Sequence, residues 1–235
     1  MARRILLKLS GEALMGDQKF GVEAVACRHI AESIKQLREL DVEIAVVVGG
    51  GNIFRGNDRK VFGFERTPAD QIGMLATAIN GIVLQQTLHS LGCESRVMSA
   101  FSCASFVETF HYQTAIDCLK KKQVLIFVGG TGHPYFTTDT AAALRASEIH
   151  AEMLLKGTKV DGVYSADPKK DPAAMKYEKL TYTEALIKKL DIMDAAAIAL
   201  CRENGIPIYV FNLFERGALK KAVTQLQGGS LVAEG

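Results

Sequence analysis

The stretch AVVVGGGNIFRG, residues 45–56, joins a run of apolar, mostly β-branched residues to three glycines and an arginine. Apolar residues at consecutive positions are typical of a strand that is buried on both faces of a parallel sheet. Glycine lets a backbone bend, or lie close to another group, where a side chain would block it. The stretch therefore predicts a buried strand that ends in a tight loop, with Arg55 close behind that loop.

Apolar runs of strand length recur along the chain, and helical patterns lie between them. The clearest helical pattern puts residues 72, 75, 76, 79 and 83 on one face, in a helix expected to begin shortly after Pro68 and to form core. Alternating strands and helices predict an α/β fold, a three-layer α/β/α sandwich with a largely parallel central sheet. We expect strands at 5–9, 44–48, 95–98, 124–128, 153–155 and 208–211, and helices at 22–40, 72–83, 138–149 and 193–204. The polar segment 165–182 is expected to loop out before a short strand near Leu180.

Composition favours one domain spanning residues 1–235, because 48% hydrophobic content in 235 residues suits one sizeable core. A net charge of +2 gives no sign of a general binder of nucleic acid or membrane. The apolar run near the N-terminus is interrupted by Lys8, and no stretch is long enough to span a bilayer. Five cysteines without a CxxC pair fit reduced thiols, so we expect a cytoplasmic protein.

Loops of one kind lie at the ends of three of the expected strands. KLSG at 8–11 closes the first strand, GGG at 49–51 follows the second, and GGTG at 129–132 follows the fourth. In open α/β sheets, ligands bind at the carboxyl ends of the strands. Three such loops therefore predict one site at that edge of the sheet.

Two common phosphate motifs are excluded. No glycine has the spacing of GxxxxGK[ST], and Tyr135 stands where GxGxxG needs its third glycine. Backbone N–H groups of the loops, with Lys8 and Arg55, still meet the needs of a polyanion site. Any one of these loops also fits a tight turn with solvated cations, and only their convergence favours the binding site.

Five segments, in order, resemble the bacterial UMP kinases, a branch of the amino acid kinase family. The segment AEMLLKGTKVDGVYSADP at 151–168 is similar to the nucleotide signature of the whole family, and the pairing of GGGNIFRG with TGHPYFTTD is typical of the UMP kinase branch. The resemblance implies transfer of the ATP γ-phosphoryl group to UMP, with Mg²⁺, in pyrimidine nucleotide biosynthesis. It also implies a homohexamer built as a trimer of dimers. The segments are KLSGEAL (8–14), GGGNIFRG (49–56), DQIGMLATAING (70–81), GGTGHPYFTTDTAA (129–142) and KGTKVDGVYSADP (156–168).

Carried over residue by residue, the resemblance implies a UMP site mainly in the N-terminal part and an ATP site mainly in residues 150–235. It leaves the protein ligands of the metal unknown, with Mg²⁺ bridged mainly by the nucleotide phosphates and Asp139 and Asp194 expected to orient cations or magnesium. The implied catalytic residues are Lys8, Arg55, Asp139 and Asp194. The implied ATP contacts are Lys8, Leu9, Ser10, Gly11, Gly51, Arg55, Thr158, Tyr164 and Asp167. The implied UMP contacts are Gly50, Asp70, Thr131, Gly132, His133, Pro134, Tyr135, Phe136, Thr137 and Thr138.

Several of these residues have plainer interpretations. Asp70 follows Thr67-Pro68 and could cap a helix instead of binding ribose. One of residues 137–139 is expected to be an N-cap, which is compatible with UMP binding. The small residues of segment 72–83 would also allow a dimer contact. Inhibition by UTP is implied, whereas GTP activation is weakly supported, since Gln85 and Gln86 stand where many relatives carry basic residues.

Two rival functions stay open. One is a related kinase that acts on a carboxylate or carbamate, and the other is a non-catalytic nucleotide-binding regulatory or storage protein. A phosphate acceptor is largely dianionic near neutral pH and needs no general base, which suits a chain whose five histidines form no cluster in the sequence. The presence of both Lys8 and Asp194 favours an enzyme.

Overall fold

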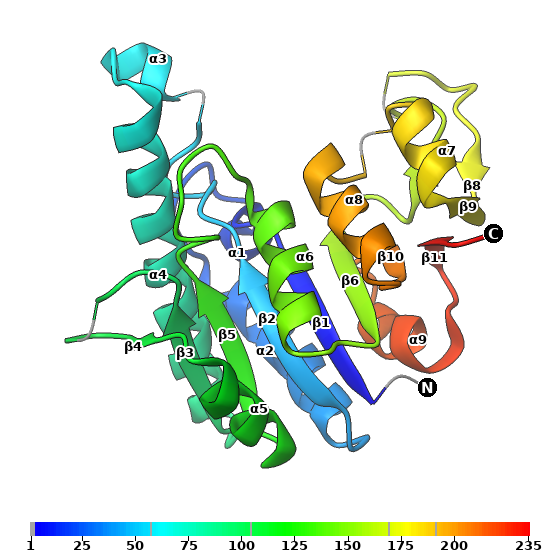
Figure 1. Cartoon of the computed structure of the whole chain (residues 1–235). Coiled ribbons are helices and arrows are strands. Elements are labelled where there is room, and N and C mark those ends of the chain that lie inside the picture. The colour runs from blue at the N-terminus through cyan, green and yellow to red at the C-terminus, as the bar shows by residue number, and fades with distance from the viewer. Residues whose placement is uncertain (1–2, 57, 104, 169, 191) are drawn as a thin grey trace.

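The computed structural model describes residues 3–56, 58–103, 105–168, 170–190 and 192–235. Within these residues the central strands are β1 (Arg4–Leu9), β2 (Glu43–Val48), β3 (Ser95–Ser99), β4 (Glu108–Thr109), β5 (Val124–Val128), β6 (Met153–Thr158), β9 (Lys179–Thr181), β10 (Ile208–Asn212) and β11 (Gly229–Ala233). They form one sheet in the order β4-β3-β5-β2-β1-β6-β10-β11-β9 (Figure 1). Neighbouring strands pair in parallel, except β10 with β11. A separate antiparallel pair consists of β7 (Val163–Tyr164) and β8 (Lys176–Tyr177).

The helices lie on both faces of the sheet. They are α1 (Glu12–Met15), α2 (Ala24–Arg38), α3 (Asp58–Phe62), α4 (Arg66–Ser90), α5 (Tyr112–Lys120), α6 (Thr138–Glu148), α7 (Tyr182–Ile187), α8 (Ala195–Glu203) and α9 (Ala218–Gln225). Helices α2, α4 and α9 share a buried cluster with one face, and α5, α6 and α8 share a second cluster with the other (Figure 1). The predicted three-layer α/β/α sandwich is confirmed. Among the described residues, no helix combines the length and apolarity that crossing a membrane requires.

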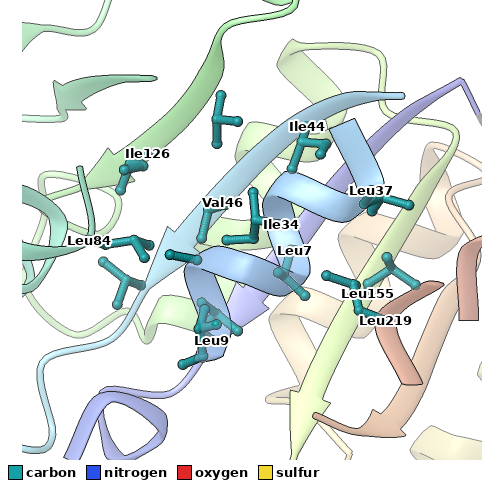
Figure 2. Close-up of a cluster of buried hydrophobic side chains, with 14 of the residues drawn as sticks. Leu7, Leu9, Ile34, Leu37, Ile44, Val46, Leu84, Ile126, Leu155 and Leu219 are labelled. Carbon is teal, nitrogen blue, oxygen red and sulfur yellow. The ribbon is translucent and has the colours of Figure 1, made fainter. Parts of the chain in front are cut away.

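Strand β1 shows why the centre of the sheet is apolar on both faces. Leu7 and Leu9 point into the cluster beneath α2, whereas Leu6 belongs to the cluster on the opposite face. Figure 2 shows Leu7 in this cluster together with Leu37 of α2 and Leu155 of β6. Burial of each such side chain contributes roughly 1.5–3 kcal/mol, so the two clusters fix the position of the strand.

Helix α4 differs from its prediction in two ways. It begins at Arg66, before Pro68, because a proline in the first helical turn lacks only an N–H that has no partner within the helix. Its apolar stripe is also not all core, since Leu75 and Ile79 are each 51% exposed. The face toward the sheet carries small residues instead, and a Cβ on Gly81 would lie 2.4 Å from Cγ1 of Val128. The helix therefore lies very close to β5.

The other expected elements are present, most of them with shifted ends. The strand expected at 153–155 continues to Thr158, and the helix expected at 193–204 begins only after Asp194. The short strand near Leu180 is present as β9, within a segment whose residue 169 lies outside the described residues. The elements that were not predicted from the sequence are α1, α3, α5, α7, α9, β4, β7, β8 and β11.

Candidate active site

The three glycine loops meet at one edge of the sheet, as predicted. They follow β1, β2 and β5, which are neighbours in the order β5-β2-β1 and run in parallel. The first two loops are in direct contact, since a Cβ on Gly11 would lie 2.8 Å from the amide nitrogen of Gly51 and 2.9 Å from the carbonyl oxygen of Gly49. A glycine at position 11 is therefore required by the close approach of two backbones.

The three consecutive glycines are not equivalent. A Cβ on Gly50 would lie 2.8 Å from Cβ of Ala76 in α4, so this glycine is needed for packing. A Cβ on Gly51 would meet nothing within 4 Å. The lack of a side chain at Gly51 therefore leaves open space beside the loop.

A buried cluster of two lysines and one carboxylate lies beside these loops. Lys8 and Lys156 are register partners on the neighbouring strands β1 and β6, so their side chains leave the same face of the sheet. Asp139 of α6 lies above them, with its two carboxylate oxygens 2.6 Å from Nζ of Lys8 and 2.9 Å from Nζ of Lys156. Lys156 also donates a hydrogen bond to the carbonyl oxygen of Ile192. The sequence reasoning missed Lys156, although its place in the nucleotide signature was a signal.

Burial and ion pairing shift the pKa values in this cluster. Burial lowers the pKa of Lys8, which is 7% exposed, and the attraction of Asp139 opposes this effect. Burial alone would raise the pKa of Asp139, but the two lysine ammonium groups hold it below its ordinary value. With both lysines protonated, the cluster carries one excess positive charge, which favours an anion at this edge of the sheet.

The starts of α6 and α8 are tied together by Asp194. This residue caps α8 by accepting a hydrogen bond from the backbone N–H of Ala197, and it also accepts hydrogen bonds from the hydroxyls of Thr137 and Thr140. Thr137 is itself the N-cap of α6, so the prediction of a cap among residues 137–139 is confirmed. The hydrogen bonds of Asp194 make it an anchor for both helices.

Arg55 is bound back against the glycine loop. Its Nε donates a hydrogen bond to the carbonyl oxygen of Gly51, 2.9 Å away, and one terminal nitrogen lies 3.0 Å from a carboxylate oxygen of Glu12. Its side chain is half exposed. The structure therefore holds this guanidinium against the glycine loop through Gly51 and Glu12, and Arg55 lines neither of the two pockets described below.

A first pocket, of about 160 Å³, lies between the loops and α4. Asp70 lies in its wall and accepts a hydrogen bond from the backbone N–H of Tyr135 at 2.8 Å. The N-cap of α4 is Glu65, so the capping alternative for Asp70 is wrong, because the helix begins earlier than the proline suggested. Of the predicted UMP contacts, those in the lining are Gly50, Asp70, Phe136, Thr137 and Thr138, whereas Thr131, Gly132, His133, Pro134 and Tyr135 are outside it.

A second pocket, of about 520 Å³, lies beyond the lysine cluster and has a size typical of ligand sites. The three predicted adenosine contacts, Thr158, Tyr164 and Asp167, all line it, together with Lys156. The hydroxyl of Tyr164 donates a hydrogen bond to Asp161 at 2.7 Å. The lysine cluster therefore lies between two pockets, since Asp139 follows Thr138 of the first pocket and Lys156 lines the second.

Across the described ranges, no group of three or more His, Cys, Asp or Glu side chains could hold a metal ion. The carboxylates of Asp139 and Asp194 are already engaged by lysines and by hydroxyls, respectively. These residues do not build a metal site made of protein ligands alone.

The family model for the amino acid kinase family matches residues 3–212. The uridylate kinase of Protochlamydia amoebophila (strain UWE25) is 53% identical over 236 residues, which cover 99% of this chain and 94% of that protein. The uridylate kinase of Magnetococcus marinus is 55% identical over 218 residues, which cover 93% of this chain and 90% of that protein.

Solved structures agree with these relatives. The crystal structure of UMP kinase from Ureaplasma parvum has a TM-score of 0.94 at 38% identity and covers 100% of both chains. The crystal structure of UMP kinase from Bacillus anthracis has a TM-score of 0.95 at 35% identity, covering 99% of this chain and 96% of that one. The chain therefore belongs to the amino acid kinase family, in the branch of the bacterial uridylate kinases.

Proposed function

We propose that the chain is a UMP kinase, which transfers the γ-phosphoryl group of ATP to UMP and forms UDP and ADP in pyrimidine nucleotide biosynthesis. One observation carries the proposal. A buried cluster with two lysines and one carboxylate lies between two pockets at the glycine-loop edge. The uridylate kinase relatives support the choice of acceptor.

The reaction requires positive charge and correct alignment of the two substrates rather than a general base. An oxygen of the UMP phosphate forms a bond to the γ-phosphorus of ATP, while the bond from that phosphorus to the β–γ bridging oxygen breaks and ADP leaves. Such transfers pass through a loose transition state, which electrostatic interactions stabilise. Lys8 and Arg55 supply positive charge, and Lys8 acts on the group in transfer because it lies between the two pockets.

The two substrates are assigned to different pockets. ATP lies in the second pocket with its adenosine on Thr158, Tyr164 and Asp167, and its phosphates extend toward the loop 8–11. UMP lies in the first pocket, with its ribose on Asp70 and its phosphate toward the glycine loops. Arg55 and Gly51 then lie where donor and acceptor phosphates meet.

The reaction uses Mg²⁺ held mainly by the nucleotide phosphates. In kinases Mg²⁺ keeps several waters and is bound by substrate phosphates with one or two carboxylates, so it needs no larger carboxylate cluster. When bound, the ion neutralises charge on the β- and γ-phosphates.

The working form of the enzyme is a cytoplasmic homohexamer, a trimer of dimers. The exposed apolar side chains of Leu75 and Ile79 on α4 support a subunit contact on that helix. Light scattering of the purified protein measures the mass of the assembly, and a monomer would contradict this part of the proposal. Inhibition by UTP stays a prediction.

The activity is tested by incubating the protein with Mg-ATP and, separately, UMP, CMP, dUMP or glutamate. We expect UDP from UMP and no acyl phosphate from glutamate. Formation of an acyl phosphate without UDP would instead support the rival carboxylate kinase. ATP binding without any transfer would support the non-catalytic rival.

A further inference from the structure

Helix α4 supports the loop after β5 through the hydroxyl of Thr77. This oxygen accepts a hydrogen bond from the backbone N–H of Gly129 at 2.7 Å and donates one to the carbonyl oxygen of Met74 at 2.6 Å. Thr77 is only 3% exposed. Water therefore has little access to replace the hydroxyl as the partner of Gly129.

One turn further along, the same helix supports the loop after β2 through Asn80. Its Nδ2 donates a hydrogen bond to the carbonyl oxygen of Gly49 at 2.7 Å, and its side chain is fully buried. Asn80 and Asn52 exchange two amide hydrogen bonds, at 2.7 and 3.0 Å, and Asn52 also donates to the carbonyl oxygen of Gly21. The amide of Asn80 therefore has a fixed orientation, and its hydrogen bond holds the carbonyl group of Gly49 in place.

The packing of α4 leaves these loops little room to move independently of the helix. A Cβ on Gly50 would lie 2.8 Å from the carbonyl oxygen of Gly73 in α4. In the loop after β5, Gly129 and Gly130 have φ values of +80° and +59°, in the left-handed region, and Thr77 binds Gly129 from α4. Gly50, Gly51 and Gly130 line the first pocket, so the two loops form part of its wall, and Thr77 lies in the same wall beneath Gly129.

We propose that Thr77 and Asn80 are positioning residues for the acceptor: through Gly129 and Gly49, they hold the two loops that form the wall of the UMP pocket. This inference rests on the proposed function, because it assigns UMP to the first pocket. Helix α4 then serves the acceptor in two ways, since it also carries Asp70. The second pocket, which is assigned to ATP, has no residue of α4 in its lining, so the affinity for ATP is independent of Thr77.

The sharpest test replaces Thr77 by valine, which keeps the shape of threonine but cannot accept the hydrogen bond from Gly129. Thr77→Ser restores the hydroxyl. Thr87→Val controls for the loss of a threonine hydroxyl on the same helix, because Thr87 donates to the carbonyl oxygen of Val83 but, unlike Thr77, lines neither pocket. Since Thr77→Ser keeps the hydroxyl and removes only the methyl group, it separates the hydrogen bond to Gly129 from the shape of the pocket wall. Calorimetry measures the Kd values for UMP and ATP, and thermal unfolding measures stability.

We expect Thr77→Val to raise the Kd for UMP about tenfold, because without the hydroxyl the loop shifts to give the N–H of Gly129 another partner and must return to its position to bind UMP, with the Kd for ATP changed less than about twofold. Thr77→Ser should restore most of the UMP affinity, and Thr87→Val should match the wild type in both affinities. If Thr77→Val does not fold, Thr77→Ala also removes the acceptor and takes its place.

A purely structural role would lower the unfolding temperature of the valine variant but leave its Kd for UMP at the wild-type value, and that result would overturn the inference. Equal loss of UMP affinity in the serine and valine variants would overturn it too. Failure of the wild type to form UDP would instead refute the proposed function, so the two failures are distinguishable.

Discussion

Replacing Lys8 by alanine should remove most of the turnover and leave the affinity for UMP nearly unchanged. Lys8 is 7% exposed, and its ammonium group lies in the charged cluster between the two pockets. There it would stabilise charge that develops during phosphoryl transfer, so the loss of Lys8 destabilises the transition state more than the bound substrates. Losing one such preorganised group costs about 10²–10³ in kcat, or about 2.7–4 kcal/mol.

The fold should survive this change. Breaking a buried ion pair costs about 3–5 kcal/mol when a charge is left without a partner. In Lys8→Ala, however, Asp139 keeps Lys156 at 2.9 Å, so we expect a smaller loss. Thermal unfolding of the variant measures this loss directly.

The assay is a coupled measurement of ADP formation at saturating Mg-ATP, with UMP varied to separate kcat from KM. Lys220→Ala, which removes an exposed lysine of α9, is the control and should match the wild type. If Lys8→Ala kept kcat within about threefold of the wild type, Lys8 would not act on the transferred group. A large rise in the KM for UMP at unchanged kcat would equally contradict the role assigned to it.

Three further predictions concern single groups. Asp70→Asn should raise the Kd for UMP about tenfold, because it removes a charged hydrogen-bond acceptor for ribose. Calorimetric titration measures this Kd, and the Kd for ATP, measured in the same way, should be unchanged. Asp139 has a pKa held below its ordinary 3.8, so its contribution to stability is complete above pH 3.8 and is lost as the pH falls through the lowered value. Urea unfolding should therefore show a difference in the free energy of unfolding between wild type and Asp139→Asn that is full at pH 7 and shrinks below pH 3.8. A difference that is independent of pH would refute the pairing of Asp139 with the lysines. Burial raises the pKa of the Cys201 thiol to about 12, so mass spectrometry after iodoacetamide treatment of the native protein at pH 8 should find Cys103 alkylated first and Cys201 unmodified.

The sequence was sufficient where one local pattern determines the structure. The strand at 124–128 has the predicted bounds, because a run of apolar residues between polar ones can be buried in few other ways. The three loops were also found, since each follows an apolar run and contains glycine. The predicted site residues on these loops accordingly lie at one edge of the sheet.

The sequence was insufficient where partners come from distant segments. Lys156 was missed because its pairing with Lys8 depends on the register between β1 and β6, which no local pattern gives. Asp70 was open to a capping role because Pro68 suggested a helix start, whereas the helix begins at Arg66. Leu75 and Ile79 were assigned to core because periodicity shows an apolar face but not what covers it.

The most direct test of the central claim, that the lysine cluster promotes phosphoryl transfer between two nucleotides, is the stoichiometry of the products. The protein is incubated with Mg-ATP and UMP, and ADP and UDP are separated by anion-exchange chromatography over time. Our account predicts one UDP for each ADP, and no ADP above background when UMP is left out. Release of ADP without UDP, or ADP formation at the same rate without UMP, would contradict it.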